Sequence, residues 1–296
     1  MQFKKLVFIV ALSSLSSYSQ AEQSKKLDLS DSVDSYKAML RVVGNLDGSA
    51  VFKDWDATIM MVLPGEKPKP ILRTIGYNAG RMIAKEDGSY EWVTREVSYY
   101  VDLKTGEIIN QWHNPISNKT VCILDVVNDP VSNAFPSPGS KNNHFAAFSQ
   151  FDVMGNVAAL RWDVPLKYPN ALQPKDHPAE STGENYVASE HFIFFANTED
   201  LEQPKSTSTN THYSWARTGP WLPWMELGQT EGYLIYSGHG NKYHSFDELS
   251  SQLKDYTLKH YPTFTDAPTS FYQPNETSWT YYLKQKKAGK LKTNCN

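Results

Sequence analysis

The chain has 296 residues, of which 29 are Lys or Arg and 32 are Asp or Glu, so its formal net charge at pH 7 is −3. This slight acidity argues against the basic surface that nucleic-acid binding needs. Hydrophobic residues make up 40% of the chain and aromatic residues 13%, which indicates a globular protein with a substantial core.

The first 21 residues are typical of a secretory signal peptide. Lys4 and Lys5 give a positive start, residues 6–12 are apolar, and Ser19 and Ala21 place small side chains at the cleavage positions. The apolar run is far shorter than the roughly 20 residues that span a membrane, so we expect cleavage and no membrane insertion. Cleavage would leave 275 residues with a net charge of −5, in the periplasm or secreted.

The mature chain begins with a predicted helix over residues 30–43, which Gly44 ends. From residue 51 apolar and polar residues alternate, as in β-strands. Asp-Gly and Thr-Gly pairs between these segments predict hairpin turns. The predicted strands of this half are residues 51–63, 71–79, 90–101, 107–114 and 120–127. The short connections predict an antiparallel meander.

The second half alternates long loops with strands. Residues 128–143 and 168–183 are rich in Pro, Ser and Asn and predict loops. A capping box at Ser245 and Glu248 predicts a late helix, and the Lys-rich tail after Leu283 predicts a flexible end. Further strands are predicted over residues 145–152, 157–164, 186–196 and 232–237. We therefore expect one mainly β domain over residues 22–296, an antiparallel meander closing into a barrel or barrel-like sheets, as in lipocalin-type folds.

The only two cysteines, Cys122 and Cys295, leave two alternatives open. In an oxidising compartment they could pair, and a closed loop of about 170 residues would add roughly 5 kcal/mol. Alternatively, Cys122 is a small buried residue and Cys295 is free in the tail. Neither cysteine has zinc-finger spacing, and the spacing of His239 and His244 is not that of a metal site, so we expect no metal and no cofactor.

Several predicted strands place arginines among apolar side chains. Arg73 shares its strand face with Tyr77, Arg95 shares its face with Tyr99, and Arg161 lies on a later strand. Either these faces are buried and hold arginines, or the arginines lie at the edge and extend their charged ends to solvent. A buried guanidinium must be paired, which allows two interpretations. One is structural pairing with a carboxylate inside a barrel. The other is a cavity whose arginines bind the anionic group of a ligand. The carboxylates available for pairing include Glu96, Asp163 and Glu190.

Residues 215–226 contain three of the eight tryptophans. Pro220 and Pro223 interrupt regular backbone pairing there, and large indoles on irregular backbone suit the wall of a pocket. Trp221 and Trp224 would stack on a ligand or, alternatively, plug the end of a barrel. The residues expected to bind a ligand are Arg73, Tyr77, Arg95, Tyr99, Trp112, Arg161, Arg217, Trp221 and Trp224.

An enzyme using the same cavity is the first alternative function. Glu226 or His191 would act as acid or base, with Tyr99 as a proton donor, in an isomerase, lyase or hydrolase. A lone strand histidine is also commonly a hydrogen-bonded core residue. No nucleophile elbow, phosphate loop, dinucleotide fingerprint or zinc-protease motif occurs in the sequence. A second alternative is a protein-interaction module with an exposed patch of tryptophans.

Seven short motifs together resemble one known family. They lie at residues 44–48, 95–96, 102–107, 112–115, 128–131, 215–225 and 275–279. In this combination they resemble the bacterial domain-of-unknown-function family numbered 1838, over nearly all of the mature chain. The resemblance implies a single full-length domain of bacterial origin, and it carries over no catalytic residues.

Taken together, the residues predict an exported soluble protein that binds a small, partly apolar, anionic molecule in a cavity lined by Trp, Arg and Tyr. A barrel interior can hold one such ligand. The sequence leaves the oligomeric state open.

Overall fold

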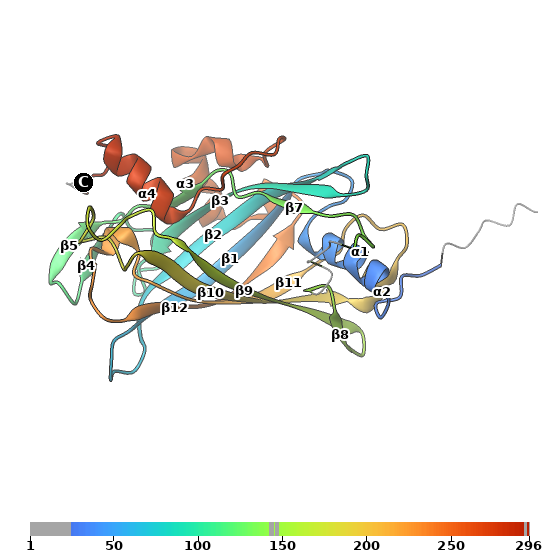
Figure 1. The fold of residues 1–296 in the computed structure, drawn as a ribbon, viewed down its shortest axis with the longest axis horizontal. Coiled ribbons are helices and arrows are strands. Elements are labelled where there is room, and N and C mark those ends of the chain that lie inside the picture. The colour runs from blue at the N-terminus through green and yellow to red at the C-terminus, as the bar shows by residue number, and fades with distance from the viewer. Residues whose placement is uncertain (1–24, 142–144, 146–147, 293–294, 296) are drawn as a thin grey trace, which may run out of the picture.

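The computed structural model describes residues 25–141, 145, 148–292 and 295. The predicted signal peptide, residues 1–21, lies outside these residues. As expected, the described chain is mainly antiparallel β-sheet with a few helices. Figure 1 shows one long sheet, with α1 (Ser32–Val43) and α2 (Thr198–Glu202) at one end and a short hairpin of β4 (Gln111–Asn114) and β5 (Lys119–Cys122) at the other.

Ten antiparallel strands form the main sheet. In space their order is β6-β3-β2-β1-β12-β11-β10-β9-β8, with β7 also paired to β3. The pairing of β1 with β12 therefore joins two meanders, one from each half of the chain. In the described residues the two end strands, β6 and β8, do not pair with each other. The strands are β1 (Val51–Val62), β2 (Lys69–Ala84), β3 (Tyr90–Val101), β6 (Val126–Asn128), β7 (Asn133–Phe135), β8 (Phe151–Met154), β9 (Val157–Pro169), β10 (Asn185–Asn197), β11 (His212–Gly219) and β12 (Tyr233–Tyr243).

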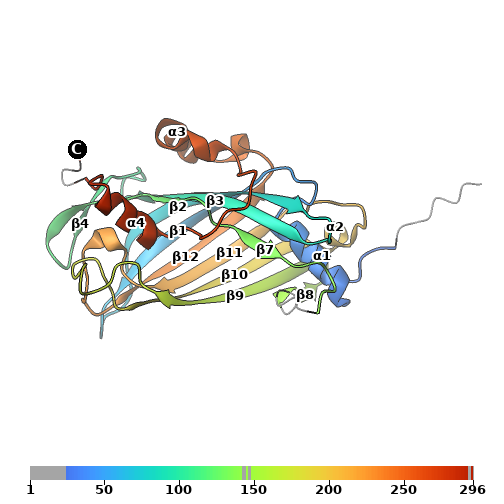
Figure 2. The same cartoon turned by 45° about the horizontal axis from the view of Figure 1, so that its top comes forward.

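The helices cover different parts of the sheet. The N-cap of α1 is Asp31, whose side chain accepts hydrogen bonds from the first turn, and the helix packs its apolar side into one end of the sheet. Helix α3 (Ser251–His260) and the 3-10 turn η4 (Pro262–Thr265) cover the outer face of β2 and β3. Figure 2 shows α3 outside the sheet, beyond these two strands.

Several predicted elements differ from the observed ones. Strand β11 was not predicted, because the Trp-rich segment was interpreted as irregular throughout, whereas it leaves the sheet only after Gly219. The predicted strand over residues 107–114 shortens to β4. The capping pair at Ser245 and Glu248 forms the short turn η3 (Phe246–Glu248), and α3 begins later, with Ser250 as its N-cap.

Aromatic rings lie directly on glycines of neighbouring strands, and this contact shapes the sheet. Trp55 on β1 is paired with Gly76 on β2, where an added Cβ would lie 2.6 Å from the indole. Tyr213 on β11 is paired with Gly240 on β12, where an added Cβ would lie 2.6 Å from Tyr213 Cζ. Glycines in strands permit such close approach and bend the sheet, so the sheet curls with these rings on its inner face.

The C-terminal segment bridges the two edges of the curled sheet. On one edge, the Ser132 amide donates to Asn275 Oδ1 at 2.8 Å. Toward the other edge, the ring of Trp279 in α4 (Ser278–Lys287) lies 4.6 Å from that of Tyr186 on β10, the strand next to β9. The expectation of a flexible tail after Leu283 is therefore wrong for the first part of that tail, because Trp279 anchors a helix there.

A disulfide joins Cys122 of β5 to Cys295, with 5.2 Å between the Cα atoms. The structure thus favours pairing over the alternative of two free thiols. The bond ties the C-terminal tail back to the β4–β5 hairpin.

Replacing Cys122 by Ser should lower the free energy of unfolding, by up to about 5 kcal/mol in the chain-entropy estimate for so long a loop. The change is measured by urea denaturation, with Cys295→Ser as the matched variant and reductant added to the wild type as a third comparison. Equal midpoints for all of these proteins would contradict a stabilising role for the disulfide.

Replacing Gly240 by Ala should destabilise the fold by about 1–3 kcal/mol, because the new methyl group overlaps Tyr213 and the backbone of β1. Combining this change with Tyr213→Ala should recover part of the loss, since the ring is one of the overlapping groups. If Gly240→Ala leaves the thermal midpoint unchanged, the contact does not constrain the sheet.

Candidate functional site

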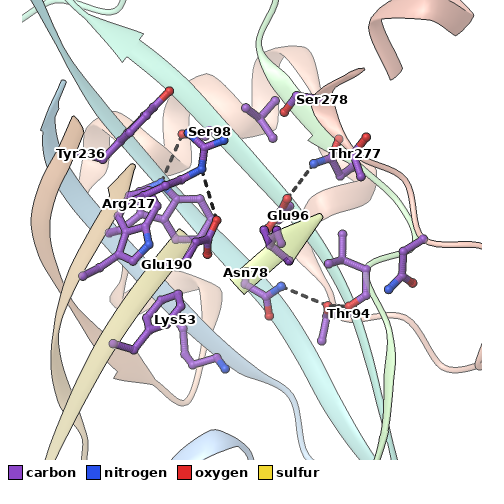
Figure 3. A pocket seen from close by; sticks show the side chains of 18 of the residues that line it. Lys53, Asn78, Thr94, Glu96, Ser98, Glu190, Arg217, Tyr236, Thr277 and Ser278 are labelled. Atoms are coloured by element: carbon purple, nitrogen blue, oxygen red, sulfur yellow. Dashed lines mark hydrogen bonds and ion pairs between the residues drawn. The ribbon is translucent and has the colours of Figure 1, made fainter. Parts of the chain in front are cut away.

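A cavity of about 520 Å³ lies on the inner face of the curled sheet, within the usual size range of small-molecule sites. Residues from both edges of the sheet line it, together with the central strands and the start of α4. Figure 3 shows its polar side chains projecting into one shared space.

Aromatic rings form a continuous wall of this cavity. The ring of Trp215 on β11 lies 6.2 Å from that of Trp55, 6.4 Å from that of Phe192 and 5.6 Å from that of Tyr236. All four residues line the cavity. Trp215 Nε1 is buried and has no hydrogen-bond partner in the described residues. The wall can therefore pack against the flat apolar part of a ligand, and Trp215 Nε1 can donate one hydrogen bond to an acceptor atom of that ligand.

Arg217 on β11 is the buried cation at one end of the wall. Its Nε lies 3.3 Å from Glu190 Oε1, its Nη2 donates to the Tyr186 hydroxyl at 2.6 Å, and its guanidinium lies over the ring of Tyr236. Burial alone would lower the pKa of Arg217, but Tyr186, Tyr236 and Glu190 raise it overall. Arg217 is therefore charged, and Glu190 already compensates its charge (Figure 3).

Glu96 on β3 is the second carboxyl group of the cavity. Its Oε1 accepts a hydrogen bond from Asn128 Nδ2 at 2.7 Å. Burial raises the pKa of Glu96 to about 7, and the nearby charge of Glu190 adds to the rise. A sizeable fraction of this carboxyl group is therefore protonated at neutral pH and can donate a hydrogen bond or a proton.

Lys53 on β1 is the unpaired cation of the cavity. No hydrogen bond or ion pair to another described residue holds its Nζ, which lies 4.7 Å from the centre of the Trp92 ring. Burial lowers the pKa of Lys53 to about 8. Lys242, opposite it on β12, donates to the carbonyl oxygens of Arg41 and Gly44 at the end of α1. Lys53 therefore lines this end of the cavity without an acidic partner among the described residues, whereas Lys242 beside it is close enough to Asp47 for that carboxylate to raise its pKa.

The arginines predicted on β2 and β3 lie on the outer face, away from the cavity. Arg73 donates to Asp56 at 2.5 and 2.6 Å, and Arg95 donates to the Thr263 carbonyl at 2.6 Å. Both side chains are partly exposed rather than fully buried. The alternation correctly grouped each arginine with its tyrosine. It did not reveal that α3 covers this face and forms a second hydrophobic core with it.

The tyrosines predicted with them are part of that core. The Tyr77 hydroxyl donates to the Phe264 carbonyl at 3.0 Å, and the Tyr99 hydroxyl lies 2.7 Å from Thr257 Oγ1. Both tyrosines therefore attach α3 and η4 to the sheet and do not face the cavity.

Trp112, Trp221 and Trp224 form a buried cluster at one end of the sheet. Trp221 is 1% exposed and Trp224 4%, and neither is among the residues that line the cavity. The ring of Trp224 packs at 5.0 Å against that of Tyr100, which does line it. Their burial agrees with the alternative in which Trp221 and Trp224 pack at one end of the fold instead of contacting a ligand, and it leaves no exposed patch of these tryptophans.

The remaining predicted residues lie apart from one another. Arg161 is 64% exposed, near Asp152. His191 is 53% exposed, with Nδ1 2.7 Å from Asp163 Oδ1, and Glu226 is exposed in a left-handed turn. Arg217 is thus the one predicted binding residue that lines the cavity.

Lys53, Glu96 and Glu190 line the cavity but were not predicted as site residues. The signal that could have shown them is the other face of the same strands. Trp55 shares its strand face with Lys53 on β1, and Thr94 and Ser98 share theirs with Glu96 on β3. Both faces of β2 and β3 are buried. The apolar face packs under α3, and the polar face lines the cavity.

No group of three metal-binding side chains is placed to hold an ion within the described ranges. None of the helices in those ranges is long and apolar enough to cross a membrane.

Glu96→Gln should make stability less dependent on pH. The pKa of Glu96 is raised in the native state, so the native protein retains a proton that the unfolded chain releases between about pH 4.5 and 7. Its contribution is complete below the unfolded pKa and is lost as pH rises to 7, by up to roughly 3 kcal/mol. Urea denaturation across this range should show a shallower loss for Glu96→Gln than for wild type.

Two comparisons sharpen that measurement. Asp125, whose pKa burial raises to about 6, contributes in the same direction, so part of the loss should remain in Glu96→Gln. The exposed Glu107→Gln is the matched control and should keep the wild-type profile. Superimposable profiles for wild type and Glu96→Gln would contradict the burial argument.

Comparisons with known proteins identify a family. No curated protein matches the chain. Among solved structures, the crystal structure of Ail, the attachment invasion locus protein of Yersinia pestis, aligns with 66% of this chain and 99% of that chain, at 8% identity and a TM-score of 0.14. That likeness is too low to bear on fold or function. Residues 48–286 match the family described as protein of unknown function DUF1838, and the chain therefore belongs to this family.

Proposed function

We propose that this protein binds a small, partly apolar, anionic molecule in the cavity on the inner face of its sheet. The observation that carries the proposal is an aromatic wall next to Lys53, a cation with no acidic partner in the described part of the chain. The apolar part of the ligand would pack on Trp55 and Trp215, and its anionic group would bind at Lys53.

Lys53 suits an anion better than Arg217 does. Glu190 compensates Arg217, and Glu96 lies close enough to both for its pKa to respond to their charges. An anion bound at Arg217 would be repelled by the carboxylate of Glu190. At the other end Lys242 lies beside Lys53. Burial and the charge of Lys53 lower the pKa of Lys242 to about 7, so the fraction of Lys242 that is protonated adds to the positive potential that favours an anion at Lys53. We therefore propose Lys53, rather than the predicted arginines, as the anion site.

The curled sheet would act as a barrel-like container, in the manner of lipocalin-type folds. Its supports are α4 across the gap between the sheet edges and the tryptophan cluster at one end. We also propose that the protein works in the periplasm or is secreted. The apolar N-terminal segment and the Cys122–Cys295 disulfide support an oxidising compartment.

Of the two alternative functions, an enzyme is supported by one observation: Glu96, whose pKa burial raises to about 7, lines the cavity and could act as an acid. The acid–base residues expected from the sequence, Glu226 and His191, do not line the cavity. The interaction-module alternative loses its basis, because Trp221 and Trp224 are buried.

Lys53→Met should weaken the binding of 4-phenylbutyrate at least about tenfold, since it removes a charge-assisted contact worth about 1.4 kcal/mol or more. Calorimetric titration measures the affinity, and quenching of tryptophan fluorescence shows that the wall is involved. The neutral analogue 4-phenylbutanol should bind wild type and Lys53→Met equally.

Two control variants define the outcome. Lys67→Met removes an exposed turn lysine, and Trp221→Phe alters the plug, so both should bind the acid as wild type does. The anion site is disproved if Lys53→Met retains wild-type affinity for the acid. The whole proposal fails if neither probe binds wild type.

A further inference from the structure

Five polar side chains form a row across the inner face of the sheet. The strand register pairs Lys242 with Lys53, Lys53 with Asn78, Asn78 with Glu96, and Glu96 with Asn128. Directly paired residues on antiparallel strands point to the same side, so the row crosses β12, β1, β2, β3 and β6. Neighbouring strands lie about 4.8 Å apart, which places Glu96 two strand spacings from Lys53.

The row contains acceptors that no described residue satisfies. Asn78 donates through Nδ2 to Thr94 Oγ1 at 3.0 Å, and its Oδ1 is buried without a partner. Asn128 donates to Glu96, and its Oδ1 is also buried without a partner. Buried polar atoms are normally hydrogen-bonded. These two oxygens are therefore free to accept a polar hydrogen, and Figure 3 shows Asn78 in the same space as Lys53 and Glu96.

Lys53 itself has the surroundings of a nucleophilic amine. It lies among the aromatic rings of the cavity, it has no carboxylate partner within the described chain, and Lys242 faces it across the β1–β12 pair. Apolar surroundings and a second cation both favour the uncharged form of a lysine, and these are the two devices that activate lysine toward carbonyl groups. The lowered pKa of Lys53 agrees with this geometry.

We propose that Lys53 captures an aromatic oxo acid in the cavity as an imine, with Glu96 as the proton donor. The inference rests on the proposed function and names the class of ligand. Such a molecule has the flat apolar group that the wall accepts and the negative charge that the Lys53 end favours. It adds a carbonyl group next to that charge. The carboxylate would stay in the positive field of Lys242 and of the imine nitrogen when protonated.

The reaction balances without an oxidant or reductant. The lone pair of the uncharged Lys53 Nζ adds to the carbonyl carbon, and a proton moves from nitrogen to oxygen to give a carbinolamine. Glu96 gives its proton to the hydroxyl group, which leaves as water, and the C=N bond forms. The nitrogen then returns a proton to Glu96. One amine and one carbonyl group thus yield one imine and one water.

Reductive trapping tests this proposal on the full mature protein. Phenylpyruvate is the probe, and 3-phenylpropionate, which has the acid but no carbonyl group, is its matched control. With cyanoborohydride present, phenylpyruvate should add one probe mass less one oxygen atom, and peptide mapping should place the adduct on Lys53. The trapping rate at Lys53 should exceed that at exposed Lys67 at least about tenfold.

The variants separate capture from binding. Lys53→Arg keeps a cation at this position, so it should bind 3-phenylpropionate more tightly than Lys53→Met does, while forming no adduct at residue 53. Glu96→Gln should still form the adduct, at a rate lowered about tenfold or more. Lys67→Arg should behave as wild type.

Each other outcome has a defined meaning. If 3-phenylpropionate binds in a Lys53-dependent way but phenylpyruvate is not trapped, imine capture is overturned and the binding function stands. If trapping is equal at Lys53 and Lys67, the adduct reflects ordinary amine reactivity and the proposal is also overturned. If neither acid binds, both the capture and the proposed function are rejected.

Discussion

The contact of aromatic rings with glycines on neighbouring strands is the constraint on which the other features depend. Trp55 lies on Gly76 and Tyr213 lies on Gly240, with no room for a Cβ at either glycine. The rings therefore lie flat on the inner face instead of filling the space within the curl. A curled sheet with flat rings leaves a cavity, whereas side chains standing upright on that face would have formed a core.

This arrangement gives β2 and β3 two buried faces with different roles. The outer face packs Tyr77 and Tyr99 against α3 and η4 and has arginines at its margin. The inner face carries Asn78 and Glu96 into the cavity. Burial on this inner face raises the pKa of Glu96 and lowers that of Lys53. The chemistry of the protein is therefore expected on the polar face of its central strands.

Local patterns predicted most of the strands but not the site. Strand β3 was predicted with its observed bounds, and β1 to within one residue, because alternation and hairpin turns are local signals. Strand β11 was missed because its aromatic residues run into two prolines. The apolar face of β2 and β3 was correctly expected to be buried, but the sequence could not show that a late helix covers it.

The polar row could not be predicted for a different reason. Lys53 and Lys242 are paired across the junction of two meanders that are distant in sequence, and Asn128 joins the row through a three-residue strand. Register between distant strands has no local signature. Trp215 and Trp279 were visible as aromatic residues in family-like motifs, yet only the curl of the sheet brings both to one cavity. Arg217 was the predicted residue whose position did agree, because its strand, β11, carries it on the face that lines the cavity.

The most direct test of the central claim is a crystal structure of the wild-type protein with phenylpyruvate bound. The account predicts electron density for the aromatic ring against Trp55 and Trp215, with the carboxylate end of the probe at Lys53 Nζ. Density for the probe at Arg217, on the outer face beside Arg73, or at Trp221 would contradict it, as would a cavity filled by protein side chains.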